Sequence, residues 1–314
     1  MKIVFLDDNS IGTDIDLSGF ESLGEVVRYG SSKLEEVPER VKDADVVIIN
    51  KMEINERTIG TAEKLKLVCV TATGTNNLDK EFLAKRNIAW RNVAGYSTEC
   101  VAQHTFALLF YLLEKMPYYD NYVKSEKYVN DAMFTHFANH FHELCGMTWG
   151  IIGLGAIGRR VADLAKAFGC HVIYYSTSGN HTEDGYERVD FDTLLKTSDI
   201  VSVHAPLTEQ TEQLMNAAAF SKMKNSAIFI NVGRGPIVVE ADLADALEQG
   251  EIAAAGLDVL SAEPMREDNP LRCIKDSEKL VITPHIAWAA VETRKRLMDI
   301  ILQQVKELFE VKQK

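Results

Sequence analysis

The sequence has few basic residues, few prolines and no long apolar run, and each shortage excludes a class of protein. Its 34 Lys and Arg residues face 46 Asp and Glu residues, which gives a formal net charge of −12. Nucleic acids and anionic membranes require a basic surface, so neither is an expected partner. The seven prolines are too few for a proline-rich linker. The longest apolar run, 106–113, is far shorter than the roughly 20 residues that cross a bilayer.

Cysteine is also sparse and irregularly spaced. The five cysteines are odd in number and form no CxxC pair, so we expect neither a disulfide framework nor a zinc ribbon. At the N-terminus only four apolar residues precede Asp7, too few for the apolar part of a signal peptide. These features together predict a cytoplasmic protein with reduced thiols.

Short β-branched runs alternate with helical patterns along most of the 314 residues, a length typical of about two domains. The runs are continuously apolar, as expected for parallel strands covered on both faces. Strands are expected at 2–6, 46–49, 67–71, 149–153, 171–175, 200–204, 227–232 and 280–283, with helices between them, for example at 156–168, 192–197 and 240–249. This order predicts an α/β, doubly wound architecture.

Two long helical patterns suggest a discontinuous domain. Residues 98–114 form an apolar pattern with Ser97 or Thr98 as its cap, and residues 291–311 form an amphipathic one. Each could cross between two α/β units, so that the C-terminus completes the N-terminal unit. We therefore expect one domain from 1–98 with 288–314, and a second from 99–287.

The second unit carries a glycine-rich turn, Gly153-Leu-Gly155-Ala-Ile-Gly158, directly after an apolar strand and before a helix. This is the context in which GxGxxG binds a dinucleotide. The first glycine permits the turn, the second admits the pyrophosphate, and the third allows close packing of helix on strand. Backbone amides at the start of the helix then bind the diphosphate.

The ribose position that follows is unusual. A site for NAD usually has Asp or Glu at the end of the next strand, but here that strand ends at Tyr175 and continues with Ser176-Thr177-Ser178. Ser176 can still bind a ribose hydroxyl, although no carboxylate is present to repel a 2′-phosphate. The nearest arginine, Arg188, is distant in the sequence. NAD is favoured, and NADP stays open.

Three later segments place a polar residue just after a strand: Arg234, Glu263 and His285. Because ligands bind at the carboxyl ends of the strands in open α/β sheets, the three can converge. A guanidinium binds a carboxylate through two hydrogen bonds, and a histidine supplies a proton near neutral pH. A neighbouring carboxylate would orient the ring and favour its protonated form. Singly, each residue could instead be a surface group, a helix cap or a structural histidine.

Over nearly its full length the chain resembles the D-isomer-specific 2-hydroxyacid dehydrogenase family. The motifs that carry the resemblance are GLGAIG at 153–158, SVHAPLTEQT at 202–211, NVGRGPIV at 231–238, AGLDVLSAEP at 255–264 and TPHIAW at 283–288. The segments ATGTNNLD at 72–79 and NVAGYSTECVAQHTFALL at 92–109 are most similar to the hydroxypyruvate reductase (glycerate dehydrogenase) branch.

The resemblance implies a Rossmann-type nucleotide-binding domain and a flavodoxin-like substrate domain joined by crossover helices, in a homodimer formed through the nucleotide-binding domain. It implies that Arg234 anchors the substrate and that His285, paired with Glu263, donates the proton. Substrate carboxylate would be held by the backbone amides around Thr73, Gly74 and Thr75. The cofactor residues it implies, with those of the glycine turn, are Gly153, Gly155, Ala156, Ile157, Gly158, Ser176, Ala205, Pro206, Val232 and Asp258.

The expected reaction is hydride transfer from a nicotinamide cofactor, NAD or NADP, to a small 2-oxo acid. Hydroxypyruvate, reduced to D-glycerate, is favoured; glyoxylate and other 2-oxo acids are alternatives. A different class of function, a dinucleotide-sensing regulator without turnover, would keep the same fold.

Two further patterns have mainly structural interpretations. His136 and His140 have the i, i+4 spacing of a metal pair on a helix but lack the HExxH order, so we favour a packed or surface helix over a metal site. An aromatic and apolar stripe is expected in the core or at a subunit interface. Its members are Phe106, Phe110, Leu113, Tyr118, Tyr119 and Tyr122.

Overall fold

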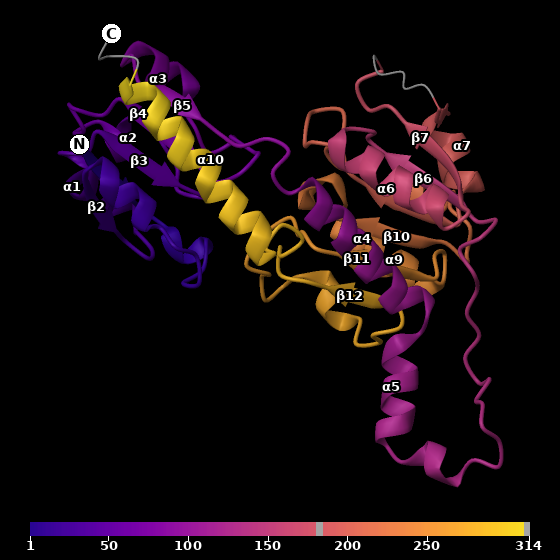
Figure 1. Cartoon of the computed structure of the whole chain (residues 1–314). Coiled ribbons are helices and arrows are strands. Elements are labelled where there is room, and N and C mark those ends of the chain that lie inside the picture. The colour runs from indigo at the N-terminus through magenta and orange to yellow at the C-terminus, as the bar shows by residue number, and fades with distance from the viewer. Residues whose placement is uncertain (180–184, 311–314) are drawn as a thin grey trace. The chain divides into compact units, whose positions relative to one another are not determined.

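A computed structural model describes residues 1–179 and 185–310, without the side chains of the last two of these (Figure 1). The chain forms two compact units. One consists of Met1–Ser97 together with Ala289–Lys314, and the other of Thr98–Trp288.

The first unit contains a parallel sheet with the strand order β2-β1-β3-β4-β5. Every residue of β3 and β4 is buried, which explains their continuously apolar sequences. The helices α1, α2 and α3 share a hydrophobic cluster with the sheet. The bounds are β1 Lys2–Phe5, β2 Glu25–Arg28, β3 Val46–Ile49, β4 Leu67–Val70 and β5 Ala89–Arg91, with α1 Val37–Val41, α2 Glu56–Ile59 and α3 Lys80–Lys85.

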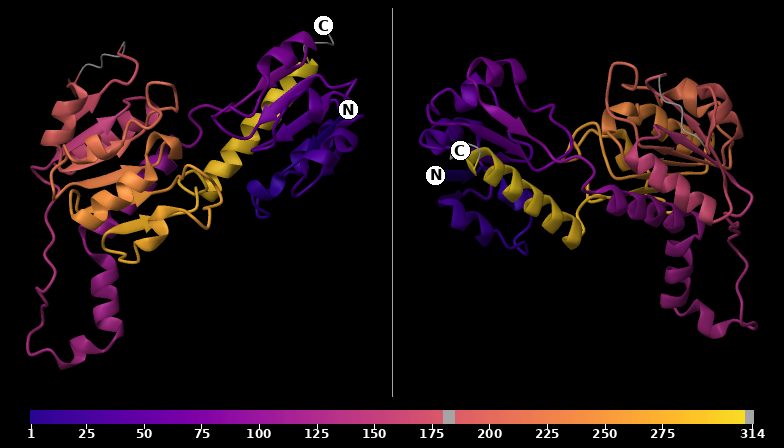
Figure 2. Two further views of the ribbon diagram at one scale, coloured as in Figure 1. Left: turned by 180° about the vertical axis from the view of Figure 1, so that it is seen from behind. Right: turned by 45° about the horizontal axis from the view of Figure 1, so that its top comes forward.

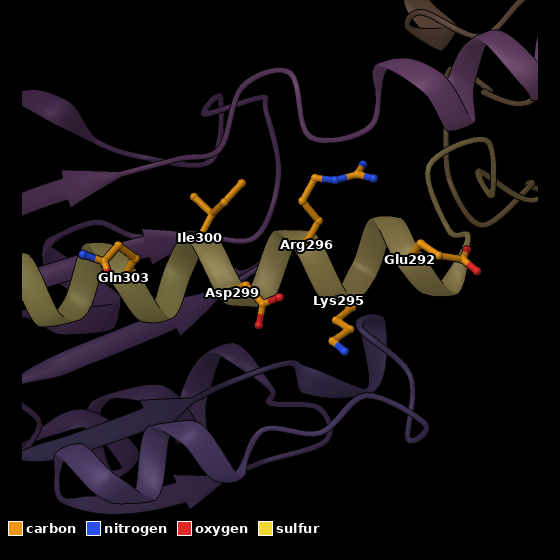
Figure 3. Close-up of a pocket in the computed structure, with 6 residues that line it drawn as sticks. All are labelled: Glu292, Lys295, Arg296, Asp299, Ile300 and Gln303. Carbon is orange, nitrogen blue, oxygen red and sulfur yellow. The ribbon is translucent and has the colours of Figure 1, made fainter.

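The C-terminal helix α10 (Val291–Glu310) belongs to this first unit. Its Arg294 donates to the carbonyl oxygen of Ile11 (2.7 Å), and its Gln304 donates to that of Asn92 (2.9 Å). Figure 3 shows the charged part of the helix, where six residues line a shallow hollow of about 480 Å³. Side chains of both charges line the hollow, Glu292 and Asp299 with Lys295 and Arg296. The buried apolar side chains of α10 are Leu297, Met298, Ile301 and Val305.

The second unit contains a seven-stranded parallel sheet with the order β12-β11-β10-β9-β6-β7-β8. The helices α4 and α6 pack on one face and α7, α8 and α9 on the other. The strands are β6 Thr148–Ile152, β7 His171–Tyr175, β8 Glu187–Arg188, β9 Ile200–Val203, β10 Ile228–Asn231, β11 Ala254–Leu257 and β12 Leu280–Ile282. The helices are α4 Thr98–Leu113, α5 Met116–Lys124, α6 Ala156–Ala167, α7 Phe191–Thr197, α8 Ala217–Phe220 and α9 Glu240–Gln249. Two parallel-sheet α/β units confirm the expected fold class.

From the end of α4 the chain leaves the body of this unit as an arm, residues 116–143, seen in both views of Figure 2. Its α5 is followed by a 3₁₀ turn, Lys127–Asn130, and an irregular return segment. The tyrosines of α5 pack against that segment: the Tyr122 ring stacks on His136 (centroids 3.8 Å apart), and the Tyr118 hydroxyl lies 2.8 Å from the His136 Nε2. The expected helix around His136 and His140 is therefore wrong, because this stretch has no regular structure.

Among the described residues, no helix combines the length and the apolar character needed to cross a membrane.

Candidate active site

The glycine-rich turn joins β6 to α6. Gly153 has φ +92°, and its amide donates to the carbonyl oxygen of Tyr175 (3.1 Å), which ties the turn to the end of β7. A Cβ on Gly158 would lie 2.2 Å from the Gly153 carbonyl oxygen, so only glycine permits this approach of helix to strand. A Cβ on Gly155 would enter open space. That space lies at the start of α6, whose first amides have no partner within the helix.

Ser176 lies beside this turn, one residue beyond β7. Its side chain is 5% exposed, and its Oγ has no hydrogen-bond partner among the described residues. A buried hydroxyl without a partner is costly unless a ligand satisfies it. The Ser176 hydroxyl without a partner and the open space at Gly155 therefore both fit a bound dinucleotide.

Arg234 follows β10 in a loop that Asn231 organises. The side-chain nitrogen of Asn231 (Nδ2) donates to the carbonyl oxygen of Arg234 (3.1 Å), and its side-chain oxygen (Oδ1) accepts from the backbone amide of Gly233 (3.0 Å). The guanidinium donates to the Gly233 carbonyl oxygen (2.8 Å). Asn231 is fully buried, so the strand end fixes the backbone that carries Arg234. Asn231 is the first residue of the motif at 231–238, but the sequence alone assigned it no role.

Gly235 brings the Arg234 loop against the loop that carries Glu263. A Cβ at this glycine would lie 1.9 Å from the carbonyl carbon of Leu260. Its φ is not positive, so close approach and not backbone conformation demands glycine here.

His285 and Glu263 form a hydrogen-bonded pair. The distance from His285 Nδ1 to Glu263 Oε2 is 2.7 Å, and the other oxygen of Glu263 accepts from the Leu260 amide (3.0 Å). Because a carboxylate only accepts, Nδ1 carries the proton of this hydrogen bond. Nε2 is thereby left as the nitrogen that can serve a substrate. The pairing predicted for these two residues is present in the geometry.

The backbone around His285 is held by Asp258, at the end of β11. Its carboxylate is 1% exposed and accepts three hydrogen bonds: from the Thr283 hydroxyl (2.6 Å) and from the amides of Ile286 (2.9 Å) and Ala287 (2.8 Å). His104 of α4 lies beside this group, with its Nε2 2.9 Å from the Thr283 Oγ1 and 3.5 Å from a carboxylate oxygen of Asp258. Burial lowers the pKa of His104, against the opposing charge of Asp258. Sequence reasoning missed His104, because a histidine within an apolar helix carries no signal of its distant partner.

The remaining expected cofactor residues lie around the same sheet edge. A Cβ on Gly153 would touch Ala205, so the segment after β9 borders the glycine turn. The Pro206 carbonyl oxygen accepts from the Thr211 hydroxyl (2.7 Å), which closes a turn there. Val232 follows directly on β10 and is buried.

His204, directly after β9, is a second partly buried histidine. Its Nε2 lies 2.9 Å from the Ser202 Oγ, which accepts from the indole nitrogen of Trp149 (2.8 Å). Its Nδ1 has no partner among the described residues, and burial lowers the pKa of His204 to about 3. The ring is therefore neutral at physiological pH.

In the first unit, the loop after β4 contains Thr73, Gly74 and Thr75. Asn92 donates to the carbonyl oxygen of Thr73 (2.6 Å), whose hydroxyl donates to that of Val93 (3.0 Å). No hydrogen bond among the described residues uses the amides of 73, 74 or 75 as donors. Three adjacent amides of this kind can bind an anion.

The chain is similar to known proteins over nearly its full length. The model of the D-isomer-specific 2-hydroxyacid dehydrogenase NAD-binding domain matches residues 106–287. A hydroxypyruvate reductase from Blautia hydrogenotrophica is 38% identical, over 98% of this chain and 97% of its own. A glycerate dehydrogenase from Methylorubrum extorquens is 36% identical, over 97% of this chain and 95% of its own. Among solved structures, the chain is similar to an NADPH-dependent glyoxylate/hydroxypyruvate reductase from Sinorhizobium meliloti, crystallised with NADP and malonate. The two superimpose with a TM-score of 0.81 at 26% identity, over 98% of this chain and 93% of the other.

The chain belongs to the D-isomer-specific 2-hydroxyacid dehydrogenase family. It is an oxidoreductase that acts on 2-hydroxy acids with a nicotinamide dinucleotide as cofactor.

Proposed function

We propose that the chain reduces hydroxypyruvate to D-glycerate, with glyoxylate as a second substrate. The observation that carries the proposal is the His285–Glu263 pair, 2.7 Å apart, with the loop that carries Glu263 packed against the Arg234 loop. The activities for which the two relatives and the solved structure are named favour these substrates.

Substrate binding is assigned to Arg234 and to the amides of Thr73, Gly74 and Thr75. The guanidinium can bind a carboxylate through two parallel hydrogen bonds, and its charge stabilises the oxyanion that forms at C2. The amides of the 73–75 loop add neutral donors for the carboxylate.

Proton transfer is assigned to His285. Its Nδ1 is bound to Glu263, which fixes the ring and directs Nε2 to the substrate oxygen. During reduction Nε2 donates its proton to the oxygen at C2, and Glu263 stabilises the charge on the ring before this transfer.

The cofactor residues of the proposal are those expected from the sequence, with the turn at Gly153, Gly155 and Gly158 holding the diphosphate. A bound reduced nicotinamide supplies the hydride that C2 receives. Asp258 holds the backbone of residues 286 and 287, directly after His285.

The test is the loss of reduced-nicotinamide absorbance with hydroxypyruvate, glyoxylate and pyruvate, each with NADH and NADPH. We expect the fastest turnover with hydroxypyruvate. Pyruvate as the fastest substrate would contradict the assignment, and cofactor binding without any turnover would favour a dinucleotide-sensing regulator.

We further propose a cytoplasmic homodimer that uses the arm as its interface. The arm exposes apolar side chains that an isolated chain would leave in water: Val129 (79%), Met133 (63%), Phe134 (85%) and Phe137 (75%). Aromatic residues in an exposed cluster are typical of interface cores.

A further inference from the structure

His104 is a partly buried histidine whose position is set by the packing of α4 on the sheet of the second unit. Leu108, one helical turn further along α4, lies against β11, where a Cβ on Gly256 would come within 3.1 Å of its own Cβ. The glycine therefore allows α4 to lie close to the sheet at this point. His104 lies beside Thr283, the residue that follows β12, with its Nε2 2.9 Å from the Thr283 Oγ1.

The direction of this hydrogen bond follows from the groups around it. The Thr283 hydroxyl has one hydrogen and lies 2.6 Å from a carboxylate oxygen of Asp258, which only accepts. The alternative acceptor for that hydrogen, the Leu257 carbonyl oxygen, is 3.5 Å away. The hydroxyl therefore donates to Asp258 and accepts from His104, so the His104 Nε2 carries a proton. Burial lowers the pKa of His104, and the ring is thus a neutral donor at neutral pH.

Asp258 transmits this restraint to the backbone at His285. Its carbonyl oxygen accepts from the amide of His285 (2.9 Å), and its carboxylate accepts from the amides of Ile286 (2.9 Å) and Ala287 (2.8 Å). The φ of His285 is +56°, so these hydrogen bonds oppose the relaxation of a strained backbone. The Thr283 hydroxyl binds the same carboxylate oxygen as the Ile286 amide, Oδ1. The orientation of the carboxylate therefore depends on the hydroxyl that His104 holds.

We propose that His104 is a positioning residue for the reduction of the 2-oxo acid. It acts through Thr283 and Asp258, which hold the backbone that presents His285. The proposal rests on the proposed function for the role of His285 as proton donor. A small displacement of that donor slows the reaction strongly, because proton transfer requires hydrogen-bond distance to the substrate. Substrate binding is assigned to other groups, so kcat and not KM should respond.

Three variants of the whole chain test the proposal. His104→Leu removes the donor but keeps an apolar side chain in α4, and we expect kcat for hydroxypyruvate reduction to fall at least about tenfold with KM unchanged. His104→Gln keeps an N–H group that can replace the ring nitrogen, so it should recover most of this loss. Thr283→Val breaks the same chain of hydrogen bonds one step further on. The double variant His104→Leu, Thr283→Val should therefore be no slower than Thr283→Val alone.

The matched control is His171→Leu in the same unit. His171 begins β7, at the opposite end of the parallel strands from the site, and its Nε2 lies 3.3 Å from Glu187. The kcat of this variant should equal that of the wild type. The proposal is overturned by an unchanged kcat in His104→Leu, by a loss that His104→Gln does not recover, or by additive losses in the double variant.

A measurement independent of turnover separates this proposal from the proposed function. If the wild type does not reduce hydroxypyruvate, the proposed function fails, and amide hydrogen exchange then tests the role of His104. The amides of Ile286 and Ala287 should exchange about tenfold faster in His104→Leu than in the wild type, because the Asp258 carboxylate no longer holds them. In His104→Gln they should exchange as in the wild type. Equal rates in His104→Leu and the wild type would overturn the proposal.

Discussion

His285 combines an unfavourable backbone conformation with the chemistry assigned to it. Its φ of +56° lies in the left-handed region, which few residues other than glycine and asparagine adopt without strain. Strain of this kind persists only where the surroundings enforce it. Here the amide of His285 donates to the Asp258 carbonyl oxygen (2.9 Å), and the next two amides bind the Asp258 carboxylate. The hydrogen bonds to Asp258 therefore hold His285 in a strained backbone conformation that positions its ring.

His285→Asn separates chemistry from folding, because asparagine tolerates the left-handed region but donates no proton to an oxyanion. We expect kcat for hydroxypyruvate reduction to fall about 10²- to 10⁴-fold, the usual contribution of a general acid. The dissociation constant of the reduced cofactor, measured by fluorescence, should be unchanged. A kcat within a factor of three of the wild type would remove His285 from the mechanism.

His204 predicts a dependence of stability on pH. Because burial lowers its pKa to about 3 in the folded chain, the unfolded chain binds more protons below about pH 6.5, where an unperturbed histidine titrates. The free energy of unfolding should therefore fall as the pH falls from about 6.5, by up to about 1.4 kcal/mol per pH unit from this group.

Urea unfolding of the wild type and of His204→Gln between pH 7 and pH 5 measures this contribution. The variant lacks the titrating ring, so its free energy of unfolding should depend less steeply on pH. Parallel curves for the two proteins would show that His204 does not titrate as the buried ring requires.

At the scale of elements, the sequence predicted most of the interior strands and the edge strand β12, and it missed the edge strands β2, β5 and β8 and the interior strand β11. β6, β7, β9 and β10 are rich in β-branched residues, and buried strands of this kind carry the strongest apolar signal. β2 and β8 lie at sheet edges and contain charged residues, so their pattern resembles that of loops. β11 has the sequence Ala-Ala-Gly-Leu, and a Cβ on its Gly256 would lie 2.9 Å from Ile230 of β10 and 3.1 Å from Leu108 of α4. Its small residues reflect packing that no local pattern reveals.

The same limit applies to the candidate site. Arg234, Glu263 and His285 were predictable because each follows a strand in a recognisable motif. The contact between Arg188 and the Gly179 carbonyl oxygen depends on a two-residue edge strand, and the contact between His104 and Thr283 joins residues 179 positions apart. Such pairs are set by tertiary packing, which sequence patterns do not encode locally.

Gly235→Ala tests the packing of the two loops that carry Arg234 and Glu263. The added methyl group would overlap the Leu260 carbonyl group, a backbone group that cannot rotate away, so the loops must separate. We expect a loss of about 1–3 kcal/mol in the free energy of unfolding, typical of overpacking, together with a kcat reduced at least tenfold. Cofactor affinity should change little, since the glycine turn and Ser176 are untouched. Full activity in the variant would contradict the close approach at Gly235.

At the scale of the whole molecule, the segments that complete each unit are far apart in the sequence. α10 completes the first unit through Leu297, Ile301 and Val305, some 200 residues after that unit's last strand. In the second unit, all strands of the sheet lie between residues 148 and 282. Its most exposed aromatic side chains lie on the arm. The tyrosines of α5 make their contacts within the arm. For example, the Tyr122 hydroxyl donates a hydrogen bond to the Asp131 carboxylate (2.7 Å), and this hydrogen bond raises the pKa of Tyr122 to about 12. The arm's phenylalanines contribute to no described core cluster.

If these phenylalanines form the interface of the proposed homodimer, charge placed on them should dissociate it. We expect light scattering after size exclusion to give the mass of two chains for the wild type and of one chain, 35.1 kDa, for the double variant Phe134→Asp, Phe137→Asp. Burying two carboxylates in an apolar interface costs several kcal/mol, more than a dimer of moderate affinity can absorb. Leu34→Asp, which alters an exposed apolar residue of the first unit, is the control and should stay dimeric. A monomeric wild type, or a double variant that remains dimeric, would exclude the arm as the interface.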